Sequence, residues 1–224
     1  MSPEIKFKTK KIVLGFDETN NGAHLKCFNK HHDSLMIVTG YLEEDLPMKG
    51  YQRHPSEAKG KIFNGNRNLQ RALERGKSFL EDNPHFLYTP IPPQIKETIP
   101  LILTYAESVA CICINFFLKY NLNPLETRVV MDEVSGEIPS RLMNEVLESW
   151  LEKAELPLPH RSMRSAASNV RAVKKADMVG YYLTAIHLQG NNHKWPYQMH
   201  KVSFGSIRKS IVDLQKRTER YPII

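Results

Sequence analysis

The sequence predicts an α/β protein with one mixed, five-stranded sheet, in which three antiparallel strands are followed by two parallel strands. Short runs of apolar and β-branched residues, separated by turn residues, occupy the first part of the chain. Two further such runs alternate with long helical segments, which is the pattern of parallel strands joined by crossover helices. Apolar residues make up 41% of the 224 residues, enough to bury the core of one domain.

The first expected strand carries a tight-turn motif at its end. Asn21-Gly22 follows the apolar run closely, and both residue types tolerate the positive φ of a two-residue hairpin turn. The predicted strands are residues 9–18, 26–29, 35–41, 128–131 and a segment within 157–165. The predicted helices are residues 66–81, 97–119, 139–153, 168 or 169 to about 188, and 206–217.

Residues 1–224 are expected to form a single domain, with residues 42–95 as a helical and irregular insertion that ends in a proline-rich connector over 89–93. Residues 101–118 are apolar enough to raise the question of a membrane span, but Glu107 and Asn115 favour a buried helix instead. The three cysteines have neither zinc-site spacing nor the pattern of a disulfide framework. We therefore expect reduced thiols in a cytoplasmic protein that has no membrane partner.

Four carboxylates occur in apolar surroundings. Asp17 and Asp132 each end an apolar strand, Glu107 interrupts an apolar helix, and Asp177 precedes a mostly apolar helical stretch. Each has a structural alternative: a turn residue for the two strand-end aspartates, a lysine partner for Glu107, and a favourable place early in a helix for Asp177. Four buried acids without partners would each cost stability, so a shared counter-charge is the alternative that explains them together.

Divalent cations are such a counter-charge. Mg²⁺ or Mn²⁺ binds carboxylate oxygens, and two ions held together form a site for phosphodiester hydrolysis. Because strand side chains alternate between faces, only one acid of each strand-end pair can face the same way on a regular strand. We favour Asp17 and Asp132, while Glu18 and Glu133 remain candidate ligands where the strand has already curled into the turn.

The charge distribution favours a nucleic-acid partner. The formal net charge is +7. Residues 156–176 contain no acid, and this segment leads directly into Asp177. Cations beside a carboxylate site would contact phosphates, although a solvated helix face is the alternative for such a segment. The basic residues predicted to bind nucleic acid are Arg161, Arg164, Arg171, Lys174 and Lys175.

The order of strands, helices and acids resembles that of the ribonuclease H-like superfamily. Gly15-Phe16-Asp17-Glu18 looks like the opening of type II ribonucleases H, and Ala176-Asp177 with the apolar residues after it is similar to uncharacterised relatives with an Asp-Glu-Ser/Thr opening. The resemblance implies helices on both faces of the sheet and a catalytic set of Asp17, Glu107, Asp132 and Asp177. The type II enzymes continue with Ala-Gly-Arg-Gly, where this chain has Thr19-Asn20-Asn21-Gly22, so specificity for RNA/DNA hybrids is not expected.

The leading hypothesis is a metal-dependent nuclease that hydrolyses RNA or DNA. A non-catalytic nucleic-acid-binding module of the same fold is the first alternative, and its binding would survive Asp132→Asn without a metal requirement. A phosphotransferase or ATPase of the actin-like class is the second, but it needs a glycine-rich phosphate loop where this chain has only Gly22. The spacing of the histidines, such as His24, His187 and His193, singles none out as an acid or base.

Overall fold

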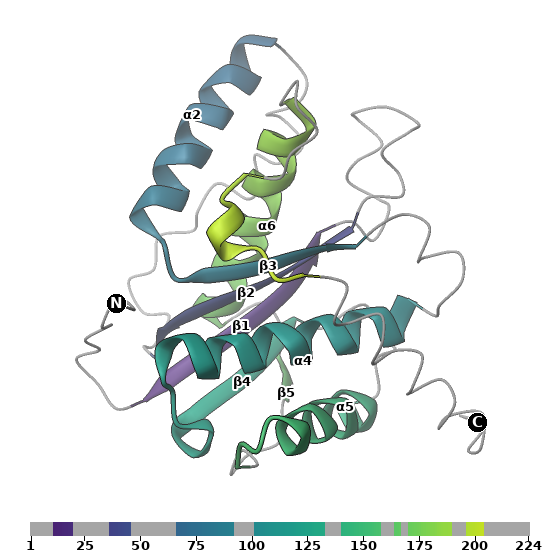
Figure 1. Ribbon diagram of the computed structural model, residues 1–224. Coiled ribbons are helices and arrows are strands. Elements are labelled where there is room, and N and C mark those ends of the chain that lie inside the picture. The colour runs from purple at the N-terminus through teal and green to yellow at the C-terminus, as the bar shows by residue number, and fades with distance from the viewer. Residues whose placement is uncertain are drawn as a thin grey trace.

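The computed structural model describes residues 11–19, 36–45, 66–91, 101–132, 140–157, 164–166, 170–189 and 196–203 (Figure 1). The described chain is an α/β structure with one mixed sheet. The strands are β1 Ile12–Thr19, β2 Met36–Glu44, β3 Phe86–Ile91, β4 Thr127–Asp132 and the three-residue β5 Arg164–Ala166. The helices are α2 Asn66–Asp82, α4 Leu101–Tyr120, α5 Ser140–Lys153 and α6 Arg171–Gln189, with short 3-10 turns η3 Pro124–Glu126 and η4 Gln198–His200.

The strands lie in the order β3-β2-β1-β4-β5. β2 is antiparallel to both β1 and β3, whereas β4 is parallel to both β1 and β5. β1, β3, β4 and β5 therefore all run in one direction and end at the same edge of the sheet. The predicted α/β class and the mixed sheet are confirmed, and the four strands β1 to β4 make up nearly all of it.

The strand at the β3 edge differs from the prediction. Residues 26–29 lie outside the described residues, and β3 instead comes from the 42–95 segment that we expected to be an insertion. Prolines around residues 89–93 predicted a connector, but Pro90 is the penultimate residue of an edge strand, where a missing N–H is tolerated. All six residues of β3 are buried, so burial rather than local propensity determines this strand.

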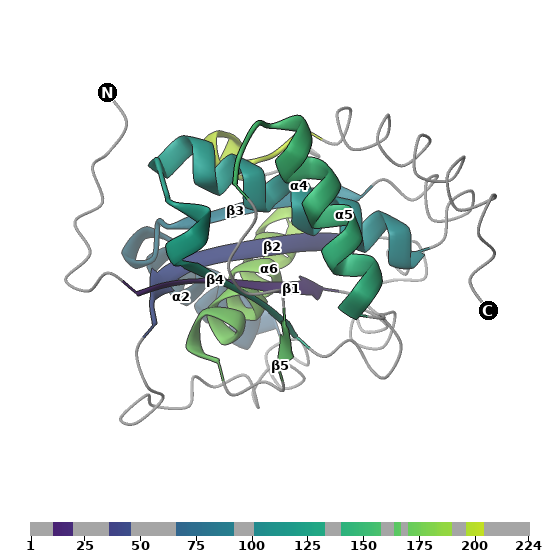
Figure 2. The ribbon, with the colours of Figure 1, turned by 90° about the horizontal axis from the view of Figure 1, so that it is seen from below.

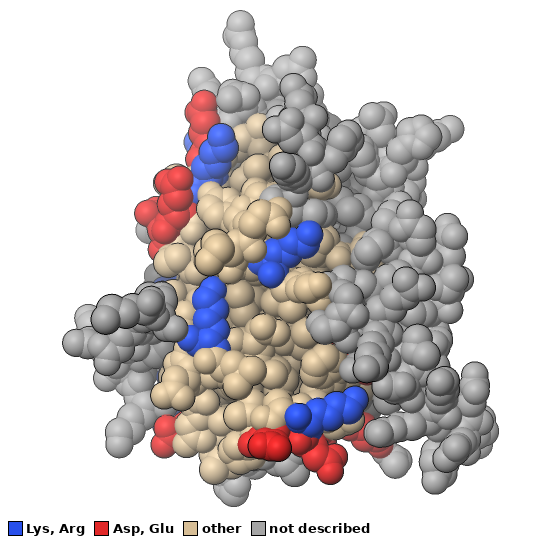
Figure 3. Space-filling model, in the orientation of Figure 1, with Lys and Arg blue, Asp and Glu red and all other residues tan. Residues whose placement is uncertain are grey.

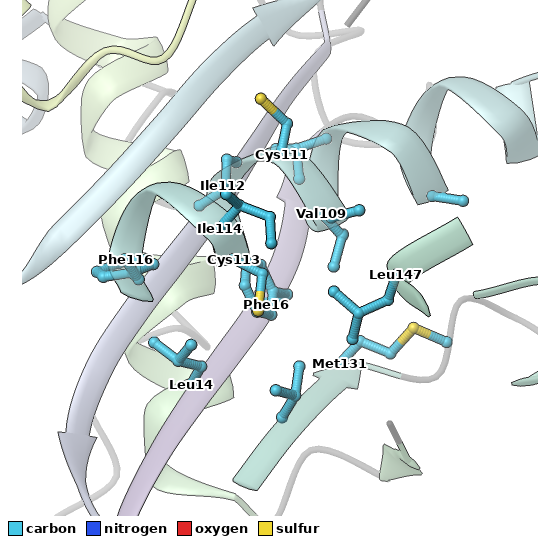
Figure 4. Close-up of a cluster of buried hydrophobic side chains, with 14 of the residues drawn as sticks. Leu14, Phe16, Val109, Cys111, Ile112, Cys113, Ile114, Phe116, Met131 and Leu147 are labelled. Carbon is cyan, nitrogen blue, oxygen red and sulfur yellow. The ribbon is translucent and has the colours of Figure 1, made fainter. Parts of the chain in front are cut away.

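Helices cover both faces of the sheet. α4 and α5 lie on one face, and α2 and α6 lie on the other (Figures 1 and 2). The α4 face holds the larger core, in which Leu14 and Phe16 of β1 and Met131 of β4 pack against buried residues of α4 and α5 (Figure 4). The α6 face holds a second core, in which residues of α6 pack against β2, β3 and the end of α2.

The residue that brings α6 closest to the sheet is Gly15. A Cβ atom at Gly15 would lie 2.3 Å from the carbonyl carbon of Ala172 and 2.3 Å from the backbone nitrogen of Val173. No side chain fits there, so the α6 backbone rests directly on the middle of β1. This contact sets the position of α6 relative to the end of β1.

The expectation of a buried helix over 101–118 is confirmed. Residues 104–114 of α4 are all buried, including Cys111 and Cys113, neither of which forms a disulfide. Of the helices in the described ranges, none has the length and apolarity needed to cross a membrane. α2, α5 and α6 begin and end within a few residues of their predicted limits, while the predicted helix over 206–217 and the start of the predicted last strand lie outside the described residues.

Candidate functional site

Two of the predicted acids are neighbours at the carboxyl ends of parallel strands. Phe16 pairs with Met131 in the β1–β4 ladder, and the next residues are Asp17 and Asp132. Adjacent strands are about 4.8 Å apart, so the backbones of these two aspartates are adjacent as well. The sheet therefore brings together two carboxylates that are more than a hundred residues apart in the chain.

Both aspartates belong to the face of the sheet that α6 covers. Val13 and Val130 pack with Ala172 and Val173 of α6 in one buried cluster. Side chains alternate along a strand, so Asp17 shares the face of Val13 and Asp132 shares that of Val130. Asp177 lies one turn farther along α6 from Val173. Three of the four predicted acids thus lie on the same side of the sheet.

Glu18 links these acids electrostatically. The pKa of the Glu18 carboxyl is raised to about 7: burial raises it most, a backbone hydrogen bond lowers it, and the negative charges of Asp132 and Asp177 raise it. Such an effect requires the three carboxylates to be close together in poorly solvated surroundings. Strand alternation places Glu18 on the α4 face, opposite Asp17, so the acidic cluster surrounds the end of β1.

Asp17 itself is buried, with 6% of its surface exposed, and its Oδ1 atom accepts a hydrogen bond of 2.8 Å from the backbone N–H of Glu18. This contact agrees with the structural alternative in which the strand-end aspartate binds the local backbone. It also orients the carboxylate at the end of the strand. Asp17 therefore has a local structural contact in addition to its place in the cluster.

Glu107 has a different environment. It is 3% exposed within α4, and its Oε2 atom accepts a short hydrogen bond from Nε1 of Trp150 in α5. This bond joins the two helices of the α4 face and satisfies the indole N–H of the partly buried Trp150. The structure therefore connects Glu107 with α5.

The chemistry of the cluster fits a hard divalent cation. Its donors are carboxylate oxygens, and Oε2 of Glu18 is a buried acceptor without a hydrogen-bond partner among the residues that the structure describes. In the described ranges, however, no three His, Cys, Asp or Glu side chains are arranged to hold a metal ion as they stand. Glu133, another candidate ligand, lies outside the described residues.

Two of the basic residues predicted to bind phosphate form ion pairs within the fold. Nζ of Lys175 lies 2.7 Å from Oε1 of Glu43 on β2, and Nε of Arg171 lies 3.0 Å from the same oxygen. Only 12% of the Lys175 side chain is exposed, and its ammonium group also lies 4.9 Å from the centre of the Tyr41 ring. Lys175 thus neutralises a buried carboxylate, which leaves little of it accessible to a phosphate.

The other predicted phosphate contacts are less defined. Lys174 is half-buried in α6; Arg161 lies outside the described residues, and only the backbone of Arg164 is described. On the face seen in Figure 3, the described Lys and Arg side chains lie apart from one another rather than in one continuous patch. The described part of that face therefore shows no concentrated basic surface.

Sequence reasoning missed three residues of this region. Tyr105 of α4 is 2% exposed, and burial raises its pKa well above the usual value, with further contributions from the charges of Glu18, Asp17 and Asp132. The only sequence feature that could have identified Tyr105 is its place as a tyrosine near the start of an apolar helix. Glu43 falls within the 42–95 segment that the sequence predicts as an insertion, and nothing in the predicted helix over 139–153 singles out Trp150.

A comparison of this chain with known protein families and with curated proteins finds no match.

Proposed function

We propose that this protein is a divalent-metal-dependent nuclease that hydrolyses phosphodiester bonds of RNA or DNA. The observation that carries the proposal is the gathering of acids near the ends of β1 and β4, where the charges of Asp132 and Asp177 act on the partly buried Glu18. A buried carboxylate surrounded by other carboxylates is unfavourable without a counter-charge. A divalent cation supplies that charge and is the usual cofactor of carboxylate nucleases.

We also propose that the fold is ribonuclease H-like. The strand order β3-β2-β1-β4-β5 supports this, together with the antiparallel pairing of β2 with β1 and β3 and the parallel pairing of β4 with β1 and β5. The helix that carries Glu107 follows the third strand, and the helix that carries Asp177 follows the fifth. These are the places that the resemblance of the sequence implies.

In this proposal Asp17, Asp132 and Asp177 hold the metal, with Glu18 as a further ligand. Mg²⁺ or Mn²⁺, when bound, activates water and stabilises the leaving oxygen. The chain itself supplies the negative charge, and the backbone N–H of Glu18 orients Asp17. Glu107 remains a proposed fourth ligand, although its hydrogen bond with Trp150 makes it the member most committed to packing.

The test is a cleavage panel over RNA/DNA hybrid, single-stranded RNA, duplex DNA and branched DNA, with Mg²⁺ and Mn²⁺ titrated separately. We expect metal-dependent cleavage of at least one substrate, and a loss of about a hundredfold or more in Asp17→Asn and Asp132→Asn, because these substitutions remove direct ligands. Asp45→Asn is the matched control. Asp45 forms a partly exposed ion pair of 3.2 Å with Arg128 at the opposite end of β1, so its cleavage rate should not change.

A nucleic-acid-binding module without catalysis is the second candidate. It is favoured by the structural contacts of Asp17 with backbone and of Glu107 with Trp150, which give two of the acids a role without any metal. This candidate predicts binding that weakens with salt and is unchanged in Asp132→Asn. Cleavage that is lost in Asp132→Asn while binding persists would exclude it.

A further inference from the structure

Tyr105 lies beside the acidic cluster for topological reasons. β3 runs in the same direction as β1 and ends at the same edge of the sheet, and α4 begins after it. The first turns of α4 are therefore brought to the end of β1, where Asp17 and Glu18 lie. The electrostatic effect of Glu18, Asp17 and Asp132 on the Tyr105 phenol is the consequence of this placement.

A hydrogen-bond donor and an acceptor near the end of β1 both lack hydrogen-bond partners among the described residues. The Tyr105 hydroxyl is a buried donor, and Oε2 of Glu18 is a buried acceptor; neither has a partner within the described parts of the chain. Each such group costs stability, so a buried site seldom keeps two of them without a use. Both belong to the α4 face of β1, since Glu18 shares the face of Phe16, which packs against α4.

We propose that Tyr105 is a positioning residue of the acidic site, whose hydroxyl donates a hydrogen bond to the Glu18 carboxylate when a divalent cation is bound there. This inference rests on the proposed metal-dependent function. A bound cation draws the neighbouring carboxylates together, and a donor on the α4 side then determines which way Glu18 points. Ligating carboxylates are commonly oriented by such hydrogen bonds.

The phenol is suited to this role. Burial and the adjacent negative charges keep its pKa well above the usual value, so the hydroxyl retains its proton and can only donate toward a carboxylate. A lysine in this place would add a competing positive charge, whereas a neutral hydroxyl orients Glu18 without displacing a cation.

The experiment compares the intact wild-type chain with Tyr105→Phe, using Mn²⁺ alone as the probe. Calorimetric titration should show Mn²⁺ binding about tenfold weaker in Tyr105→Phe, which is the usual effect of removing a group that orients a ligand. The melting temperature without metal should be equal or higher, because the substitution removes a buried hydroxyl that has no partner. Cleavage should lose kcat with KM for the nucleic acid unchanged.

Tyr120→Phe is the matched control. Tyr120 is the last residue of the same helix, at the end away from the acids, and its ring stacks on that of Phe116 with 5.7 Å between the ring centres. It should bind Mn²⁺ as the wild type does. Glu18→Gln provides a second test: adding Tyr105→Phe to it should weaken Mn²⁺ binding by no more than about twofold further, since the hydroxyl acts through Glu18.

Equal Mn²⁺ affinity in Tyr105→Phe and the wild type would overturn the inference, as would a lower melting temperature without metal, which would assign the hydroxyl a structural role. Additive losses in the double variant would overturn it too. A wild type that neither binds Mn²⁺ nor cleaves any substrate would instead remove the proposed function, and with it this inference.

Discussion

Two glutamates in neighbouring strands of this sheet have opposite surroundings. Glu43 of β2 is 9% exposed and shares its Oε1 atom with Lys175 and Arg171 of α6. Glu18 of β1 is surrounded by Asp132 and Asp177, whose negative charges raise its pKa. Glu43 lies on the face that α6 covers, whereas Glu18 lies on the α4 face. Even so, α6 carries both the cations that neutralise Glu43 and the Asp177 charge that acts on Glu18.

This difference in neighbouring charge distinguishes a carboxylate that stabilises the fold from one that can bind a ligand. A buried carboxylate with cations of its own needs nothing further from the solution. A buried carboxylate that lies beside other carboxylates is stable only when it is protonated or when a cation binds to it. We therefore interpret the Glu43 cluster, comprising Glu43, Lys175 and Arg171, as part of the fold, and the acidic cluster around Glu18 as the place where a ligand is to be expected.

The largest effect is expected from Gly15→Ala, which disturbs both clusters at once. The new Cβ atom would lie 2.3 Å from the backbone of Ala172, so α6 must move away from β1. We expect a loss of at least about 3 kcal/mol in the free energy of unfolding, measured by urea denaturation. Gly76→Ala, in which the new methyl group meets the ring of Tyr182 instead of a backbone, should cost less because a side chain can shift.

Lys175→Met breaks the Glu43 cluster alone. The variant leaves Glu43 with Arg171, whose side chain is 31% exposed, and removes the better buried cation. We expect a loss of about 2 kcal/mol in the free energy of unfolding. The double variant with Glu43→Gln should recover much of it, since no buried charge is then left; a double variant less stable than Lys175→Met would contradict this.

Glu18→Gln should increase the free energy of unfolding, in contrast to the two preceding variants. The pKa of Glu18 rises from 4.5 unfolded to about 7 folded, so the folded chain keeps a proton that the unfolded chain releases. The free energy of unfolding of the metal-free protein therefore decreases as the pH rises from about 4.5 to 7. Because glutamine cannot ionise, the variant should be more stable by about 1–2 kcal/mol at pH 8 and no more stable at pH 4. Parallel stability curves for the two proteins in a chelating buffer would refute this.

The smallest effect concerns His85. Burial lowers its pKa below 6.5, the charge of Lys175 lowers it further, and Glu43 raises it. The folded chain therefore takes up a proton less readily than the unfolded chain, and this stability contribution is lost as the pH falls below 6.5. In Lys175→Met the pKa of His85 should rise, followed by NMR titration of the imidazole.

Several features were predictable from the sequence because they depend on local pattern. The positions of α2, α4, α5 and α6 follow from apolar periodicity, and β1, β2 and β4 follow from β-branched runs. The placing of Asp17 and Asp132 at strand ends was equally visible. In contrast, β3 was mistaken for a connector because its prolines contradict strand propensity, while its burial between α2, α4 and α6 overrides that propensity.

The partners of the charged residues were not predictable. Lys175 appeared to belong to a phosphate-binding segment, since a run of cations without acids looks the same whether its partner is a nucleic acid or a distant carboxylate. Glu43 is 132 residues away in the chain, and only the packing of α6 on β1 and β2 brings the two together. The same holds for Tyr105, whose closeness to Glu18 depends on where β3 ends.

By itself, the amino-acid sequence determined the positions of α2, α4, α5 and α6 and of β1, β2 and β4, that α4 is buried, and that acids lie near the ends of β1 and β4. It could do so because periodicity and turn chemistry act over a few neighbouring residues. Only the tertiary structure decided which acids share a neighbourhood and which have cations, because that depends on register and on the contact of α6 with Gly15. Charges interact through space, and the distances between them are set by packing rather than by position along the chain.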